Sequence, residues 1–317
     1  MIGVDERTEA WLLMQIKPDR VPATQVSCAA VETGAICNLR CPFCRTGNGT
    51  MALEKKFLTQ DGFEKILERL GPQLNFLALL RWGEPLLNPQ IFGIVQQASA
   101  ANVATLMHSS LSLPSFDSRA AERTVSSGLR ELTVSCDGAS QGVYQQYRAG
   151  GRFKLVMRNL KLLLEARRRL GSTTPKIRWQ FLVHRGNQHE MRTAARMAER
   201  LGIGIEFRRL WAPDPWTLEP DAVKIAFPKK PNPLFEYQPC LQIWDMPGVH
   251  SDGSVYPCCV VTDAKYSLGN IFHEPMDAIW NKPLAVAMRR YLRSGVKSNM
   301  TIPCYNCPRD PNRKVAA

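Results

Sequence analysis

Apolar runs of strand length alternate with amphipathic stretches of helix length from about residue 30 to residue 211. Parallel strands need a long crossover connection between them, and a helix is the usual form of that connection. The alternation therefore predicts an α/β domain with a parallel sheet and right-handed crossovers. The six predicted strands are residues 30–36, 75–80, 103–109, 131–136, 177–183 and 203–209.

The predicted helices carry local start and stop signals. Thr59 precedes the amphipathic stretch "QDGFEKILERL" and Gly71 follows it, so a helix is expected between these two residues. Pro89 marks the start of another helix. Residues 153–170 and 187–201 show helical periodicity and basic last turns, which suit the negative end of the helix dipole.

The alternation breaks after residue 211, where a proline-rich, aperiodic stretch is typical of a linker. Beyond it, a second cysteine-bearing region shows a turn at Asp252 and Gly253, a short strand and two short helices. The predicted divisions are an N-terminal extension (1–29), a main domain (30–211), a linker (212–231), a small C-terminal domain (232–312) and a tail (313–317).

The composition limits the classes of function. No apolar run is long enough for a membrane span, and the N-terminus lacks the features of a signal peptide, so a cytoplasmic protein is expected. Ten cysteines in a reducing compartment favour metal or redox use over disulfides. The net charge of +13 is scattered without interleaved aromatic residues, so nucleic-acid binding is not favoured.

Three cysteines, Cys37, Cys41 and Cys44, occur in "CNLRCPFC" directly after the first predicted strand. Active sites of parallel sheets gather at the carboxyl ends of the strands, so this position suits chemistry. Three thiolates can hold three irons of a cubane [4Fe–4S] cluster and leave the fourth iron open to a small molecule. The alternative is half of a zinc site, which "CYNC" at 304–307 would complete; the spacing favours the cluster.

The motif "CNLRCPFC", with Phe43 before the third cysteine, resembles the signature of the radical S-adenosylmethionine (radical SAM) enzymes, and the resemblance extends over about residues 30–211. It implies a partial (β/α)6 barrel, which agrees with the six predicted strands. It also implies that the open iron binds S-adenosylmethionine and that one electron cleaves this cofactor. The resulting 5′-deoxyadenosyl radical would then take a hydrogen atom from the substrate.

Two further matches resemble cofactor-binding parts of that family. "RWGEP" keeps Gly83 and Glu84 of a Gly-Gly-Glu-Pro motif, whereas Trp82 departs from it. The resemblance implies that the glutamate and the backbone at this motif contact the methionyl amine. Arg148 resembles the arginine that pairs with the methionyl carboxylate, and a guanidinium fork suits a carboxylate.

The segment "VSCDG" at 134–138 ends the fourth predicted strand and resembles a segment whose polar side chains approach the cofactor ribose. Strand alternation places Ser135 and Asp137 on one face and Cys136 on the other, so Cys136 is expected to be a core thiol. Five other residues are given no firm role: Cys28, His108, Ser109, Ser110 and Gln180.

The remaining cysteines resemble the ligands of the shortened SPASM region, often called a Twitch domain, over about residues 232–312. The implied ligands are Cys240, Cys258, Cys304 and Cys307. They imply one auxiliary [4Fe–4S] cluster, and so two [4Fe–4S] clusters in the chain. Four thiolates leave no open iron, which suits electron transfer. Cys259 is left as either a packed thiol or a donor of a hydrogen atom.

The favoured function is a radical SAM dehydrogenase, in which the substrate radical loses an electron to the auxiliary cluster. The alternatives are an epimerase, for which Cys259 would donate hydrogen, and an enzyme that modifies a ribosomal peptide. Only about 36 residues precede Cys37, which is short for the peptide-recognition domain of many peptide-modifying relatives. A carbohydrate- or aminocyclitol-like small molecule is therefore the favoured substrate.

The expected redox partner is an electron-donor protein such as a flavodoxin or ferredoxin. The alternative from another class is a zinc-stabilised protein that binds nucleic acid, which the net charge would suit.

Overall fold

A computed structural model describes residues 16–51, 54–210, 216, 240–258, 261 and 263–307. The strands in these residues form one sheet with the order β6-β5-β4-β3-β2-β1-β7-β8-β9. They are β1 (Cys28–Val31), β2 (Phe76–Leu79), β3 (Ala104–Ser109), β4 (Glu131–Ser135), β5 (Lys176–Val183), β6 (Gly204–Arg209), β7 (Gly248–Val249), β8 (Ser254–Tyr256) and β9 (Gly269–Asn270).

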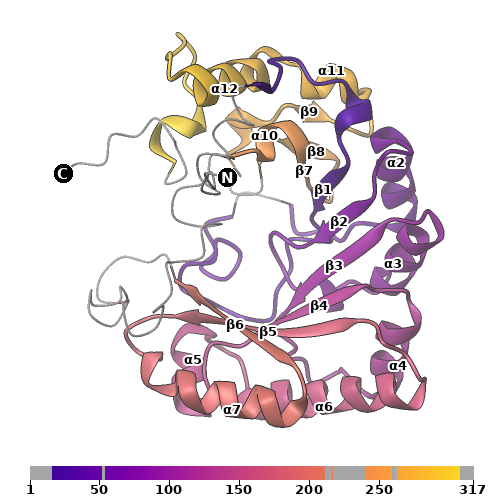
Figure 1. Cartoon of the computed structure of the whole chain (residues 1–317), viewed down its shortest axis with the longest axis vertical. Coiled ribbons are helices and arrows are strands. Elements are labelled where there is room, and N and C mark those ends of the chain that lie inside the picture. Colours follow the sequence, from indigo (N-terminus) through magenta and orange to yellow (C-terminus); the bar gives the residue numbers. More distant parts are fainter. Residues whose placement is uncertain are drawn as a thin grey trace, which may run out of the picture.

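The predicted α/β class with a partial barrel is confirmed. Strands β1 to β6 pair in parallel and lie side by side in sequence order. The sheet curves, and its edges β6 and β9 do not pair within the described residues, so the barrel stays open (Figure 1). The prediction for the first strand is wrong beyond Val31, because the chain leaves the sheet there and Gly34 forms an antiparallel bridge with Phe57.

Six helices cover the outer face of the curved sheet (Figure 1). They are α2 (Gln60–Leu70), α3 (Ile91–Ala100), α4 (Ser118–Ser126), α5 (Gln141–Tyr147), α6 (Phe153–Arg169) and α7 (Met191–Leu201). The predicted cap of α2 is confirmed, because the Thr59 hydroxyl accepts a hydrogen bond from the Gly62 amide at 3.1 Å. On β5, the buried Trp179 and Phe181 alternate with residues that face the barrel interior.

The C-terminal region extends the barrel sheet. Strand β7 pairs in parallel with β1, and β8 returns antiparallel after the predicted turn at Asp252 and Gly253. Helices α10 (Gln242–Asp245), α11 (Met276–Trp280) and α12 (Pro283–Ser294) complete this region. The barrel and the C-terminal region are therefore joined through one sheet.

The described part of the predicted N-terminal extension lies against the C-terminal region. The Trp244 indole donates to the Pro18 carbonyl at 2.7 Å, and the Arg289 guanidinium donates to the Asp19 carbonyl at 3.0 Å. The predicted linker 212–231, except for residue 216, and the predicted tail 313–317 lie outside the described residues. Within the described part of the chain, no helix has the length and apolar character of a membrane span.

Candidate active site

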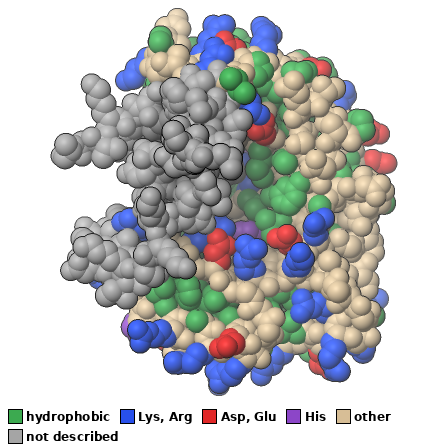
Figure 2. All heavy atoms as spheres, in the orientation of Figure 1, with side chains coloured by type: hydrophobic (Ala, Val, Ile, Leu, Met, Phe, Trp, Pro, Cys, Tyr) green, Lys and Arg blue, Asp and Glu red, His purple; other side chains and the backbone are tan. Residues whose placement is uncertain are grey.

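A cavity of about 310 Å³ lies at the carboxyl ends of β1 to β5. The residues that line it come from the cysteine loop and from the strand ends. They include Cys37, Cys41, Cys44, Gly83, Glu84, His108, Ser109, Ser110, Ser135, Arg148 and Gln180. In the space-filling view, hydrophobic side chains lie in a hollow of the molecule with acidic, basic and histidine side chains beside it (Figure 2).

The cysteine loop is held to the barrel by short hydrogen bonds. The Asn38 side-chain amide donates to the Ser112 carbonyl at 2.9 Å, and the Arg40 amide donates to the Ala149 carbonyl at 2.8 Å. These contacts join the loop to the segments that follow β3 and α5. All three thiols of the loop consequently border the same cavity.

The three thiols of the loop border one cavity, as the protein ligands of a cubane cluster should. Ligands of a cubane bind three different irons, so the thiols should border a space without meeting at one point. Burial raises the pKa of Cys37 to about 12 and also raises that of Cys41. Their thiolates therefore need a cationic partner, which iron supplies.

Gly83 allows the loop after β2 to touch the loop after β1. Its φ is +93°, and a Cβ at this position would lie 1.9 Å from the Gly34 carbonyl oxygen. The next residue, Glu84, donates its amide to the Ile36 carbonyl at 2.8 Å. A glycine is therefore needed here to bring the glutamate beside the cysteine loop.

Glu84 is buried, with 3% of its surface exposed, and four protein groups donate to its carboxylate. The Ser109 hydroxyl reaches Oε1 at 2.7 Å, and the Ser110 amide and hydroxyl both reach Oε2 at 2.7 Å. The Leu86 amide donates to Oε1 at 3.3 Å. A carboxylate has about four lone-pair directions. A direct bond to the methionyl amine would therefore require one serine hydroxyl to turn away.

Arg148 enters the cavity with support from Asp137. Its Nε lies 2.6 Å from Oδ2 of Asp137, whose Oδ1 accepts from the Leu182 amide at 2.6 Å. Asp137 is fully buried and is not among the lining residues, so the structure places it behind the arginine. Its ribose contact stays a prediction. Arg148 also forms a side-chain hydrogen bond with the Cys41 thiol, so the arginine lies beside the cysteine loop, and its guanidinium fork suits a ligand carboxylate there.

Polar residues continue across the interior of the barrel. His108 on β3 lies opposite Thr133 on β4. Further along the sheet, Ser135, Gln180 and Glu206 lie opposite one another on β4, β5 and β6. Burial and the Arg208 guanidinium lower the pKa of His108 to about 4, so its imidazole is neutral at physiological pH. These side chains can offer hydrogen bonds to a polar molecule held beside the cluster.

The other cysteines lie away from this cavity. Cys136 is fully buried in the main core, with its thiol 3.6 Å from the Gly138 carbonyl, whereas Cys28 begins β1. None of the four predicted auxiliary ligands lines the cavity. Cys240 precedes α10, Cys258 follows β8, and Cys304 and Cys307 belong to a tight turn near the end of the described chain. Cys259 lies outside the described residues.

Arg81 joins the two cysteine regions and was missed by the sequence analysis. Its guanidinium reaches the Cys258 carbonyl at 3.2 Å, the Val261 carbonyl at 3.0 Å and the His250 Nε2 at 2.8 Å. Burial, followed by the Arg81 charge, lowers the pKa of His250 to about 3, so Nε2 can accept. Gly248 gives the guanidinium room, because a Cβ there would lie 2.0 Å from Nη1. The sequence feature that could have pointed to Arg81 is its position as a charged residue directly before Trp82 and Gly83.

Comparison with known proteins agrees with this architecture. Residues 31–176 match the radical SAM superfamily, and residues 240–308 match the SPASM iron–sulfur cluster-binding domain. The chain is a radical SAM protein. Its C-terminal region is a SPASM domain, and its cofactors are S-adenosylmethionine and [4Fe–4S] clusters.

Solved structures with similar folds include Streptococcus suis SuiB bound to S-adenosylmethionine, with a TM-score of 0.66, 14% identity, and coverage of 90% of this chain and 71% of SuiB. The anSMEcpe structure with bound AdoMet and Cp18Cys peptide has a TM-score of 0.66, 15% identity, and coverage of 90% and 88%. BtrN in complex with AdoMet and 2-DOIA has a TM-score of 0.52, 14% identity, and coverage of 90% and 92%. At these identities the likeness shows the fold.

Two curated relatives are similar in sequence. The AdoMet-dependent heme synthase of Methanosarcina barkeri is 27% identical over 138 residues, which are 43% of this chain and 39% of that protein. The mycofactocin maturase MftC of Mycobacterium ulcerans is 26% identical over 183 residues, which are 58% of this chain and 47% of that protein. The chain thus spans less than half the length of either relative.

Proposed function

We propose that this radical SAM enzyme abstracts a hydrogen atom from a polar substrate and then oxidises the substrate radical, with the SPASM cluster as electron acceptor. The observation that carries the proposal is that the three thiols, Glu84 and Arg148 line one cavity at the strand ends. The SPASM match supports a second cluster in the same chain.

Bound together, the first cluster and S-adenosylmethionine supply a 5′-deoxyadenosyl radical that can remove a hydrogen atom from carbon. The residues of the chain hold and orient the reactants. The three cysteines of the loop would bind three irons, Arg148 would receive the methionyl carboxylate, and Glu84 would place a fixed negative charge near the methionyl amine. Asp137 would keep the Arg148 guanidinium turned toward the cavity, since their contact is 2.6 Å long.

The interior of the barrel supports a polar substrate. Glu206 on β6 accepts from Arg208 at 2.8 Å and from Arg178 at 3.4 Å, in the register of the cavity-lining Gln180. Neutral His108 also lines the cavity. This combination of charged and neutral hydrogen-bonding groups suits a substrate with several polar atoms more than a hydrocarbon.

The substrate class that the relatives favour is a peptide. One similar protein is named as a mycofactocin maturase, and one solved structure with a similar fold holds a Cp18Cys peptide. This replaces the small carbohydrate favoured in the sequence analysis as the first candidate. An aminocyclitol-like molecule remains the second candidate, because BtrN, solved with AdoMet and 2-DOIA, also shares the fold.

The deciding experiment is anaerobic purification, iron and zinc analysis, and reduction by dithionite with S-adenosylmethionine and a panel of peptides and aminocyclitols. We expect a brown protein with about eight irons per chain, two cubanes of four. Substrate-dependent 5′-deoxyadenosine and a product lighter by two hydrogens are also expected. A colourless protein with stoichiometric zinc would refute the proposal and favour a zinc-stabilised binding protein.

The same reaction in deuterium oxide separates oxidation from inversion. Oxidation places no solvent deuterium on the reacting carbon. An epimerase with an exchangeable thiol donor, the role predicted for Cys259, would retain one deuterium there. Deuterium in an otherwise unchanged product would therefore refute the dehydrogenase proposal while leaving hydrogen abstraction intact.

A further inference from the structure

A buried polar cluster lies where β1 meets β7, at the junction of the barrel and the C-terminal region (Figure 1). Glu32 follows β1 directly, and Arg81 lies in the loop after β2. His250 and Ser251 come from the turn between β7 and β8. Glu32 has 1% of its surface exposed, and the next residue, Thr33, lines the cavity as Arg81 does. Glu32 therefore lies close behind the cavity wall, although the proposed function gives it no task.

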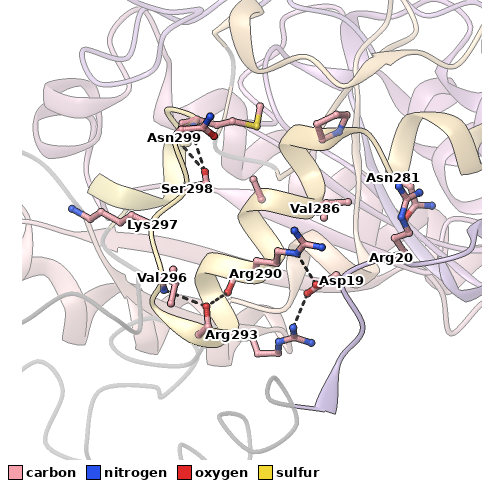
Figure 3. A pocket seen from close by; sticks show the side chains of 14 residues that line it. Asp19, Arg20, Asn281, Val286, Arg290, Arg293, Val296, Lys297, Ser298 and Asn299 are labelled. Atoms are coloured by element: carbon pink, nitrogen blue, oxygen red, sulfur yellow. Dashed lines mark hydrogen bonds and ion pairs between the residues drawn. The ribbon is translucent and has the colours of Figure 1, made fainter.

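The Glu32 carboxylate is incompletely hydrogen-bonded. Its Oε1 accepts from the Ser251 hydroxyl at 3.0 Å, and the Ser251 amide also stabilises the ionised form. Oε2 is buried and meets no donor at hydrogen-bond geometry in the described part of the chain. A surface acid of the same region is paired instead, because Asp19 lies 2.8 Å from Nε of Arg290 and 2.9 Å from Nη2 of Arg293 (Figure 3). A buried carboxylate with an unmatched oxygen holds a proton more readily than such a paired acid.

The surroundings of Glu32 place its titration near neutral pH. Burial raises the pKa of Glu32 to about 7, and the Asp252 charge also raises it, whereas its hydrogen bonds and the Arg81 guanidinium oppose the rise. Burial and the Arg81 charge lower the pKa of His250 to about 3, and burial raises the pKa of Tyr256. Of Glu32, His250 and Tyr256, Glu32 is therefore the group that changes charge near neutral pH.

Arg81 links Glu32 to the segment that carries a predicted SPASM ligand. Its guanidinium donates to the Cys258 carbonyl at 3.2 Å and to the Val261 carbonyl at 3.0 Å. Four thiolates make a [4Fe–4S] cluster anionic, and an added electron makes it more so, so a cation beside the ligand backbone fits such a cluster. In a poorly polarisable interior, an electron that reaches the cluster also acts on Glu32 and favours its protonated form.

We propose that Glu32 takes up one proton when the SPASM cluster accepts one electron. The inference rests on the proposed function, in which this cluster receives the electron of the substrate radical. The substrate radical loses that electron and gives one proton to solvent. The Glu32 carboxylate takes one proton from solvent and becomes a neutral carboxyl. One electron and one proton thus enter the buried junction together, and its net charge is unchanged.

The coupling is reciprocal, so the charge of Glu32 should set the reduction potential of the SPASM cluster. When Glu32 is ionised, its negative charge opposes the added electron; when it is protonated, this opposition is absent. The potential should therefore fall as the pH rises through the titration of Glu32. Between about pH 5.5 and pH 8.5 we expect at least a three-fold change in the equilibrium constant for reduction, equivalent to about 28 mV for a one-electron couple.

The test is a redox titration of the reconstituted holoenzyme at several pH values, followed by electron paramagnetic resonance. S-adenosylmethionine should change the signal of the first cluster, whose three-cysteine site leaves an iron open, so the unchanged signal reports the SPASM cluster. Glu32→Gln keeps the shape of the side chain but cannot titrate. It should hold the potential at every pH near the value that the parent reaches in acid.

Glu274→Gln is the matched control in the C-terminal region. It also removes one negative charge, but Glu274 pairs with Lys282 at 2.7 Å, and this contact lowers the pKa of its carboxyl. Glu274 is therefore ionised throughout the pH range, and the control should keep the pH dependence of the parent. Ser251→Ala removes a hydrogen bond that lowers the pKa of Glu32, so the fall in potential should move to higher pH.

A potential that does not change with pH in the parent would overturn the proposal, as would an unaltered pH dependence in Glu32→Gln. Loss of the pH dependence in Glu274→Gln as well would also refute it. If Glu32→Gln fails to hold the SPASM cluster, Ser251→Ala decides, and a fall that stays in place or moves to lower pH refutes the proposal. The titration uses no substrate, so a failure to form an oxidised product would refute the proposed function separately.

Discussion

The two cysteine regions are built in different ways. The first places three cysteines within residues 37–44, on one loop that backbone and side-chain hydrogen bonds fasten to the barrel. The second draws its four predicted ligands from three segments between residues 240 and 307. The first site can therefore be organised largely by local sequence, whereas the second depends on the packing of α10, β8 and the terminal turn.

This difference also separates their tasks. The first region surrounds a cavity with a buried carboxylate and a guanidinium, as a site for a zwitterionic ligand requires. The second has Cys304 8% exposed and packed in the main hydrophobic core. Low polarity, together with the four thiolate ligands predicted for this region, would suit a centre that passes electrons without binding substrate.

Replacement of Cys37, Cys41 and Cys44 together by Ala should have the largest effect. Cleavage of S-adenosylmethionine should be abolished, because no thiolate remains to hold the first cluster. About four irons per chain should remain, the content of one cubane. Iron analysis and the yield of 5′-deoxyadenosine measure the two effects.

Cys136→Ala is the control for that variant, because its thiol is buried in the core and does not line the cluster cavity. It should keep both clusters, apart from a modest loss of stability. Loss of all iron from the triple variant would show that the SPASM site cannot form without the first cluster. The two cysteine regions would then not form their sites independently, as the comparison above assumes.

The opposite variant, Cys304→Ala with Cys307→Ala, should spare the first cluster and stop the reaction later. Cleavage of S-adenosylmethionine should continue, since the cavity residues are unchanged, but the oxidised product should be lost. Product analysis by mass spectrometry, alongside the yield of 5′-deoxyadenosine, measures this separation. Normal formation of the oxidised product would remove the SPASM cluster from the electron path.

Much of the barrel could be predicted from the sequence because each strand and helix has its own periodicity. The cysteine loop, Glu84 and Arg148 could likewise be placed by motif resemblance, and the structure brings them to one cavity. The supporting contacts could not be predicted, because they join distant segments. Ser110 is 26 residues from the carboxylate it holds, and Arg81 is 177 residues from Cys258.

The first strand shows a further limit. The apolar run 30–36 has the composition of a strand, but pairing with β2 ends at Val31. The remaining residues turn toward Phe57 and the cysteine loop, with Gly34 bridging to Phe57. Composition cannot reveal where a strand ends when the residues that follow are also apolar and buried.

Glu84→Gln should weaken S-adenosylmethionine binding by about 10- to 150-fold, with a smaller effect on folding. The amide keeps the shape of the side chain but removes the charge, and a hydrogen bond to a charged group contributes about 1.5–3 kcal/mol. Isothermal titration calorimetry of the anaerobic protein measures the affinity, and thermal unfolding measures the stability.

Ser109→Ala distinguishes two roles for that carboxylate. If Glu84 bonds the methionyl amine directly, removal of the serine hydroxyl, 2.7 Å from Oε1, should leave the affinity equal or higher. If the serine is needed to hold the carboxylate in place, the affinity should fall, though by less than in Glu84→Gln. Unchanged affinity in both variants would remove Glu84 from the cofactor site.

Arg81→Lys should have the smallest effect of these variants, and it should alter both cysteine regions. Arg81 has a φ of +124°, which is strained for a residue with a side chain, and its guanidinium holds three acceptors at the junction. A lysine is shorter and lacks the planar fork, so it cannot satisfy all three acceptors. We expect less than a ten-fold loss of S-adenosylmethionine affinity, equivalent to about 1.4 kcal/mol, and a shift in the reduction potential of the SPASM cluster.

The control is Arg123→Lys on α4, where the guanidinium lies 4.5 Å from the centre of the Phe92 ring. This variant should change neither the affinity nor the reduction potential. If Arg81→Lys alters only one region, the arginine supports that region alone, and the two cysteine regions are not coupled through this contact.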